Sequence, residues 1–274
     1  WSPFKALEWL SLRAIPEKKS DETNYYFFET VDGHKFKTLS ELVSSESTMR
    51  YFQVPTGHRE SDSADISRDF SNIKNITFIK ENQKLREHMD GAFSSVLYQH
   101  DVTTKQWGKT IYNYNEDTNV RYITDNRVTK NDSIYTTSPN VNFNLTTKQT
   151  GLMGGAYPNV QNHENWFQRS MSSKSLIDTI KVRIKVSGNS VLRVGNVVDF
   201  FIPRVGALKT SDTEWYDPRI SGKFLITTLR HTITPDGYTN TMILAKNSYE
   251  VSLADQSTFM GTSNQSETNL VERK

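Results

Sequence analysis

Residues 180–186 constrain the fold of this chain more than any other segment does. They read Ile-Lys-Val-Arg-Ile-Lys-Val, so apolar and cationic side chains alternate without a break. A period of two residues is typical of a β-strand that buries one face and leaves the other in water. The apolar positions are Ile180, Val182, Ile184 and Val186, and the wet positions are Lys181, Arg183 and Lys185.

Turn sequences and further β-prone segments follow this strand. Ser187-Gly188-Asn189 and Pro235-Asp236-Gly237 are turn sequences. Between and after them, residues 197–202, 224–233 and 238–246 are rich in β-branched and aromatic side chains. Several short strands separated by turns predict a small antiparallel barrel or sandwich.

The N-terminal residues predict a helix followed by a hairpin. Ser2 suits the N-cap of a helix over 2–14, and Pro3 suits its first position. An apolar stripe made by Phe4, Leu7, Trp9 and Leu10 is expected to be buried. Segments 25–30 and 35–39 flank Asp32-Gly33, a hairpin turn sequence.

The middle of the chain is less regular. Residues 44–72 predict a linker, 73–80 a strand, 81–89 a short helix, and 92–101 with 106–115 a pair of strands. Residues 116–169 are rich in Asn, Thr and Tyr, which indicates an insertion or a functional loop region, with a helix starting at Asn162.

The predicted fold class is mainly β, with some α+β character: a small antiparallel β-barrel with an inserted domain and an N-terminal helix and hairpin. The predicted division is 1–50, the end of a preceding domain; 51–115, a linker and the first part of the barrel; 116–174, an inserted polar domain; 175–253, the second part of the barrel; and 254–274, a flexible or partner-bound tail.

Composition excludes several classes of protein. The charges of the 33 basic and 31 acidic residues nearly cancel, whereas a protein that binds nucleic acid normally has a strong basic excess. The chain has no cysteine, hence no disulfide, thiolate metal ligand or cysteine nucleophile. No apolar run approaches the roughly 18–20 residues that span a bilayer, and no signal peptide is expected. A chain that starts at Trp1 rather than Met is expected to be a fragment or a processed product.

Catalytic chemistry finds no support in the sequence. Phosphate-loop, dinucleotide, zinc-protease and nucleophile-elbow motifs are absent, and the six histidines never fall at a short ligand spacing. A glycosidase would need two paired acids, but nothing pairs the candidates Glu29, Asp90, Asp101 and Asp199. The cluster at His163–Trp166 is more typical of a helix start than of an active site. We therefore predict a non-enzymatic protein without catalytic, cofactor or metal site.

An ordered set of motifs resembles a known family. The first motif is Gly188, Leu192, Gly195, Val198, Phe200, Ile202 and Pro203; the second is Gly222, Lys223, Phe224, Leu225, Ile226, Thr227 and His231; the third is Lys246, Asn247 and Ser248; and an upstream one is Gly91, Ser95, Asp101 and Lys105. In this order they resemble the closing barrel of central baseplate hub proteins of contractile-tail, T-even-like phages, which are related to the base of type VI secretion spikes.

The resemblance implies a structural subunit. Hubs of this family are trimers whose subunits each carry two tail-tube-like barrels, arranged as a ring between a sixfold tube and a threefold spike. Only one barrel is expected here, from about 73–115 joined to 175–250, so the other lies upstream or belongs to another chain. The implied partners are a homotrimer of the chain itself, a central spike protein, tail tube or tube-initiator proteins, the tape measure protein, and DNA only in transit through the lumen. The implied location is the virion tail baseplate, assembled in the host cytoplasm.

The predicted contact residues lie on two strands and one loop. For subunit contact we expect Ile180, Lys181, Val182, Arg183 and Ile184 on one strand and Leu225, Thr227 and Leu229 on another. Trp215 and Tyr216, in loop 204–221, are expected either to dock a partner or to pack over the barrel mouth. The cationic face is expected to be solvated or to meet a subunit, rather than to bind phosphate. Two alternatives stay open: a tail-tip carbohydrate-binding module built on 116–160, and a spike-associated cell-wall hydrolase.

Overall fold

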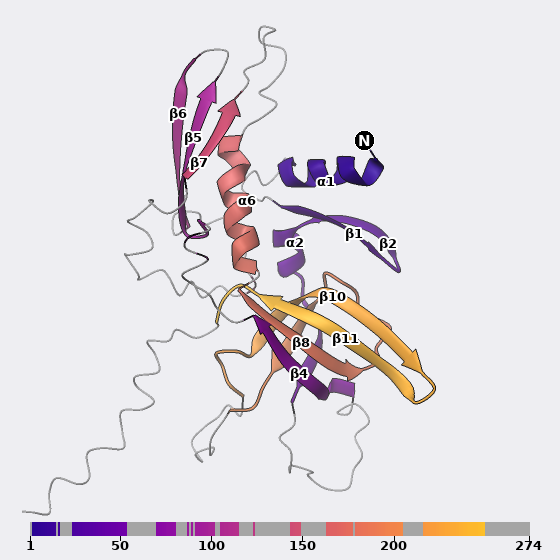
Figure 1. The fold of residues 1–274 in the computed structure, drawn as a ribbon. Coiled ribbons are helices and arrows are strands. Elements are labelled where there is room, and N and C mark those ends of the chain that lie inside the picture. Colours follow the sequence, from indigo (N-terminus) through magenta and orange to yellow (C-terminus); the bar gives the residue numbers. More distant parts are fainter. Residues whose placement is uncertain are drawn as a thin grey trace, which may run out of the picture.

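A computed structural model gives the architecture of the chain. It describes residues 2–14, 16, 24–53, 70–80, 87, 89, 91–101, 105–114, 123, 143–148, 163–177, 179–204 and 216–249. Among them are a two-stranded hairpin, a six-stranded sheet and a three-stranded sheet (Figure 1). The mainly β fold class predicted from the sequence is confirmed. No helix within these ranges is long and apolar enough to cross a bilayer.

The largest element is a curled sheet of six strands in the order β3-β9-β10-β11-β8-β4. Its strands are β3 (Ser47–Phe52), β4 (Ile73–Lys80), β8 (Ile180–Ser187), β9 (Val197–Phe201), β10 (Gly222–Thr234) and β11 (Gly237–Lys246). All neighbours are antiparallel except β3 and β9, which run parallel. The two edges approach each other at one bridge, between Phe52 and Asn72, so the sheet curls toward a barrel.

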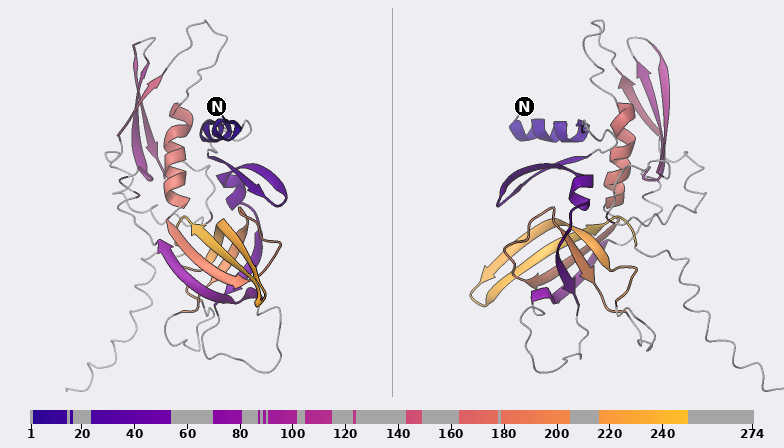
Figure 2. Two further views of the ribbon diagram at one scale, coloured as in Figure 1. Left: turned by 45° about the vertical axis from the view of Figure 1, so that its right-hand side comes forward. Right: turned by 180° about the vertical axis from the view of Figure 1, so that it is seen from behind.

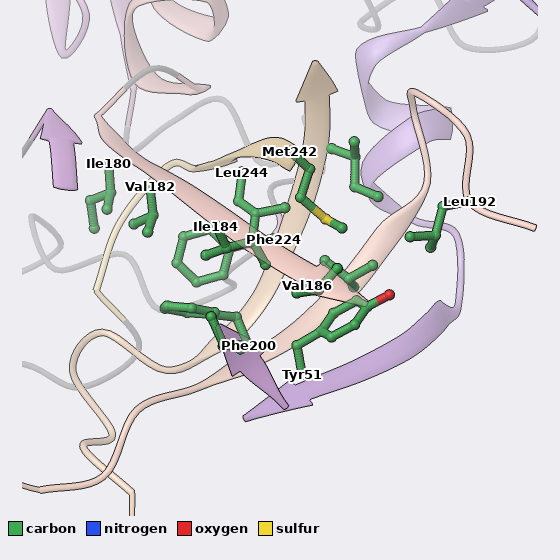
Figure 3. Packing of buried hydrophobic residues seen from close by; sticks show 13 residues of the cluster. Tyr51, Ile180, Val182, Ile184, Val186, Leu192, Phe200, Phe224, Met242 and Leu244 are labelled. Atoms are coloured by element: carbon green, nitrogen blue, oxygen red, sulfur yellow. The ribbon is translucent and has the colours of Figure 1, made fainter. Parts of the chain in front are cut away.

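The concave side of this sheet encloses the main hydrophobic core. On β8 the apolar side chains are buried and the cationic ones point outward, as the alternation predicts. Phe200 and Phe224 meet edge to face inside, with ring centroids 5.3 Å apart, and Tyr51 enters from β3 (Figure 3). The other buried members are Ile73, Ile180, Val182, Ile184, Val186, Leu192, Val198, Ile226, Met242 and Leu244.

An N-terminal layer is made by α1 (Pro3–Arg13), β1 (Tyr25–Thr30), β2 (Gly33–Thr38) and α2 (Leu39–Val43). This confirms the predicted helix and hairpin. The side chain of Ser2 accepts a hydrogen bond from the Lys5 amide as the N-cap. Gly33 takes φ +108° in the hairpin turn, a conformation that glycine adopts without steric cost.

The predicted burial of the α1 stripe is wrong. Phe4 is 67% exposed, Leu10 44% and Trp9 41%. The reason is that, among the described elements, α1 packs mainly against β1, where Phe4 reaches Phe27 at a ring distance of 6.1 Å. The spacing of apolar residues identified the helix correctly but did not reveal how little of the described structure packs against it.

The N-terminal layer packs on the outer side of β9 and β10. Leu39, Leu42 and Val43 of α2 form a second apolar cluster with Val197 and Leu225. Phe28 of the hairpin joins this cluster. One outward patch of the curled sheet is therefore covered by the chain itself.

A second sheet has the order β6-β5-β7, made by β5 (Ser94–Asp101), β6 (Trp107–Asn113) and β7 (Phe143–Lys148). Helix α6 (His163–Ile177) stands between this sheet and the N-terminal layer (Figure 2). Gln168 donates to the Ser95 carbonyl at 2.8 Å, and the Tyr112 hydroxyl donates to Ser172 at 3.2 Å.

Two predictions about the middle of the chain need correction. Residues 92–115 were expected in the barrel, but β5 and β6 pair with each other and with β7 in the second sheet. Residues 44–72 were expected to be a linker, but they contain β3, an edge strand of the curled sheet. A two-residue period identifies a strand without identifying its neighbours, because pairing depends on residues far away in the chain. The predicted helix 81–89 lies almost entirely outside the described residues.

Candidate assembly surfaces

The predicted contact strand β8 divides into two sets of side chains. Ile180, Val182 and Ile184 are 2%, 0% and 0% exposed and belong to the chain's own core. Lys181 is half-buried and Arg183 is exposed, both on the outer side. A neighbouring subunit could therefore meet the cations of this strand, whereas the three apolar side chains are already buried.

The predicted contact residues of β10 are also engaged within the chain. Leu225 is buried beneath the N-terminal layer. The Thr227 hydroxyl donates to the Ile243 carbonyl at 3.1 Å, and Leu229 packs against the main core.

Tyr216 packs beside the end of β9. Its ring meets Phe201 edge to face at 5.0 Å, and Arg204 donates from Nε to its carbonyl at 3.0 Å. Both contacts lie within the chain, and the choice between partner docking and packing over the barrel mouth stays a prediction. Trp215 lies outside the described residues.

Outward side chains of β4, β8 and β10 form a basic face, defined as Lys80, Lys181, Arg183, Lys185 and Arg230. The register places Arg183 opposite Thr77 on one side and Ile243 on the other, and Lys185 opposite Asn75 and Thr241. Thr241 is in turn opposite Arg230. The spacing alone predicted the cations of β8, but the contributions of β4 and β10 could only be seen once the strand order was known.

The β10–β11 hairpin carries an aromatic contact close to the turn after β8. His231 Nδ1 lies 2.7 Å from the Tyr238 hydroxyl, and the two rings stack. The other side of the contact is Gly188, where an added Cβ would lie 2.1 Å from Tyr238 Cδ1. The glycine of the predicted turn is therefore required by this ring.

A cavity of about 900 Å³ opens beside this contact. Its apolar wall is Met49, Phe70 and Tyr238, and its polar wall is Ser71 and residues 187–190. Two buried polar atoms belong to the same end of the core: Tyr51 Oη and Asn240 Oδ1, neither of which has a hydrogen-bond partner among the described residues. The side-chain Nδ2 of Asn240 donates to the Asn189 carbonyl at 2.8 Å, which links the Asn240 side chain to the cavity wall.

Burial raises the pKa of the Tyr51 hydroxyl from 10.0 to about 12, and the nearby Asn189 side chain partly opposes the rise. Because the proton is held more tightly in the folded state, its contribution to stability is complete below about pH 10 and is lost as the pH approaches about 12. We expect the Tyr51→Phe variant to lose less stability than the parent protein between about pH 9 and pH 12. Urea unfolding at both pH values measures the difference.

At neutral pH the same variant is expected to change the free energy of unfolding by less than about 1.5 kcal/mol, because the hydroxyl makes only a weak contact, with the Asn189 side chain, outside good hydrogen-bond geometry. An equal alkaline loss in the parent and in Tyr51→Phe would contradict the assignment of the raised pKa to Tyr51.

The second sheet has an aromatic face on the side away from α6, defined as Tyr98, His100, Trp107, Lys109 and Ile111. His100 and Trp107 are directly opposite on β5 and β6, with ring centroids 4.5 Å apart. Lys109 Nζ lies 5.8 Å from the Tyr98 ring. Trp107 is 65% and Ile111 57% exposed. Sequence reasoning missed this face because it assigned both strands to the barrel.

The carboxylates singled out from the sequence do not converge. Asp199 forms an ion pair with Arg50 at 3.3 Å across β9 and β3. Asp101 is buried in the second sheet, and Glu29 is exposed on the hairpin. Asp90 lies outside the described residues. Among the residues that the structure describes, no three His, Asp or Glu side chains gather in a way that could hold a metal ion.

Comparison with known proteins gives structural similarity only. No family model and no curated protein matches the chain. Among solved structures, the chain is similar to a tail protein from Neisseria meningitidis MC58, with 11% identity and a TM-score of 0.38 over 81% of this chain and 51% of that one. It is also similar to the 43 kDa tail protein of prophage MuSo2 from Shewanella oneidensis, with 10% identity and a TM-score of 0.40 over 89% and 54%. The chain spans about half the length of each.

Proposed function

We propose that this chain is a structural subunit of a phage tail baseplate hub. In this role three copies form a ring that joins the tail tube to the central spike, and the ring lines the channel for the tape measure protein and DNA. The work of such a subunit is mechanical, so no residue is assigned to catalysis. Its place would be the tail baseplate of the virion.

The observation that supports the proposal is where the motifs that resemble hub proteins lie in the structure. Leu192, Val198, Phe200, Phe224 and Ile226 all lie fully buried in the core of the curled sheet. The glycines and the charged corner of the same motifs shape its turns and ends. Gly188 lies against Tyr238, Gly195 and Gly222 take positive φ, and Lys246 is buried with its Nζ donating to the Ser221 carbonyl at 2.8 Å.

The curled sheet also has edges that suit assembly. Its edge strands β3 and β4 approach at one bridge, Phe52 to Asn72, and the described residues show no longer ladder between them. Exposed strand edges are liable to pair with other chains, and rotational symmetry can cover them by placing each edge against the next copy. A closed ring of copies therefore fits this sheet.

The proposal is tested by the mass and shape of the purified chain. We expect light scattering after size exclusion to give three times the chain mass. Negative-stain images should show a ring with a central hole of roughly 30–40 Å, about the width of a duplex with clearance. A monomer that persists at tens of micromolar would count against the hub. Adding the sequence upstream of Trp1, if the natural protein has one, tests whether a second barrel is needed for closure.

One observation favours a second candidate, a carbohydrate-binding module at the tail tip. Exposed aromatic rings on a sheet offer apolar surface with polar edges, and the aromatic face presents Trp107 beside His100. Under this candidate, retardation in polysaccharide gels should occur with the parent chain and disappear in Trp107→Ala. If the chain were retarded in polysaccharide gels and also formed no ring, the carbohydrate-binding candidate would take the place of the hub proposal.

A further inference from the structure

We propose that the basic face of the curled sheet docks an acidic surface of a neighbouring protein subunit. The inference rests on the structural role proposed above, because a tail part must contact other proteins. It goes further by assigning the contact surface, its charge and the chemistry of its partner.

The first observation is the absence of acidic residues from this part of the sheet. The strands β4, β8, β10 and β11 contain eight Lys or Arg residues and no Asp or Glu. The whole chain carries a formal charge of only +2. The positive charge is therefore concentrated on these strands and is not a general property of the chain.

The second observation is the arrangement of the five cations of the basic face on the outer side; Lys246, one of the eight, is buried. Arg183, Lys185 and Arg230 are exposed. Cations two residues apart on one strand are separated by roughly 7 Å, and neighbouring strands by about 5 Å. Lys80 pairs with Lys181 across β4 and β8, which extends the cations from β8 onto the neighbouring strand. An acidic surface placed on this face would meet the exposed side chains of Arg183, Lys185 and Arg230.

The shape and the intervening side chains favour a protein over a nucleic acid. The face is the outside of a curled sheet, so the cations diverge instead of lining a groove. Ile243, half-buried, lies at its centre between Arg183 and Thr228. An apolar centre within a polar rim is typical of protein interfaces. The outward positions that pair across β8, β10 and β11 carry no aromatic ring on which a base could stack.

The test measures binding of a model acidic polypeptide. Fluorescein-labelled poly-L-glutamate is titrated with the full chain at low salt, and its anisotropy is followed. We expect Arg183→Glu combined with Lys185→Glu to weaken binding by about tenfold or more, and salt to weaken binding by the parent chain. The matched control is Lys5→Glu with Lys35→Glu, which changes the net charge equally on the N-terminal layer and is expected to weaken binding by at most about twofold. Circular dichroism confirms that both variants are folded.

Three outcomes would overturn the inference. Equal losses in both double variants would show that net charge alone matters. Tighter binding of a duplex DNA of matched charge, lost in the face variant, would assign the surface to nucleic acid. If the variant with Arg183→Glu and Lys185→Glu bound poly-L-glutamate as the parent does but no longer formed the trimeric ring, the basic face would be assigned to contact with a second copy of the chain. The result is separable from the proposed function, since a ring can form in a chain whose basic face binds nothing, and a monomer can bind the polypeptide.

Discussion

Phe224→Ala is expected to destabilise the protein by about 3–5 kcal/mol, because it removes a fully buried aromatic side chain and leaves a cavity. The ring meets Phe200 edge to face, and Lys246 Nζ lies 5.2 Å from its centroid. Both contacts are lost in the variant, and the buried ammonium group loses a neighbour. Urea unfolding followed by circular dichroism measures the change.

Phe4→Ala is the matched control, because it makes the same chemical change at a residue that is 67% exposed on α1. We expect it to cost less than about 1 kcal/mol. If the two variants were equally stable, the cluster inside the curled sheet would not be the main core of the protein.

Gly188→Ala is expected to destabilise by about 1–3 kcal/mol even though it adds only one carbon. The new Cβ would lie 2.1 Å from both Cδ1 and Cγ of Tyr238. Cγ is close to the backbone, so the ring cannot escape by a small rotation. The Gly188 amide also donates to the Tyr238 carbonyl at 2.9 Å, and this bond holds the two segments together.

A double-mutant cycle identifies the cause of that loss. In a Tyr238→Ala background, Gly188→Ala should cost at least about 1 kcal/mol less than it does in the parent, because the obstructing ring is gone. Gly108→Ala serves as a control, since its nearest neighbour would be 3.9 Å from the added Cβ. Additive effects of the two changes would mean that backbone conformation, and not the ring, requires the glycine.

The parts of the fold that the sequence predicted share a strong local signal. The alternation in residues 180–186 is strict, and each of its apolar side chains is buried. Ser2 with Pro3 started the first helix, and Asp32-Gly33 formed the hairpin turn. In each case the determining contacts lie within a few residues of one another, so the pattern and the structure depend on the same side chains.

The parts that it did not predict depend on distant contacts. Strand β3 has the sequence Ser-Thr-Met-Arg-Tyr-Phe, with no strong alternation, and it is a strand because β9 pairs with it. Strands β5 and β6 were recognised, but their sheet was not, since β7 and α6 come from a segment that resembles a polar insertion. The sequence of one strand alone does not show which distant strand it pairs with.

The contact residues were predicted unevenly for a related reason. The alternation that identified β8 also implies that Ile180, Val182 and Ile184 face a core, and the curled sheet supplies that core within the chain. Their cationic neighbours remain outside, where Arg183 joins Arg230 and Lys80 from other strands. The cations of this surface come from three strands, so the sequence reveals only those that lie together on β8.

The parallel pairing of β3 with β9 affects the order in which the chain can fold during synthesis. Arg50 and Asp199, which form an ion pair across these strands, are 149 positions apart. At 5–20 residues per second, a ribosome needs roughly 7–30 s to make the residues between them. During that time β3 has emerged without its partner, whereas β8 to β11 come out nearly consecutively and can pair as they appear. The first strand of the curled sheet to be made is thus among the last to be paired, and a chaperone or a neighbouring nascent chain has time to reach it first.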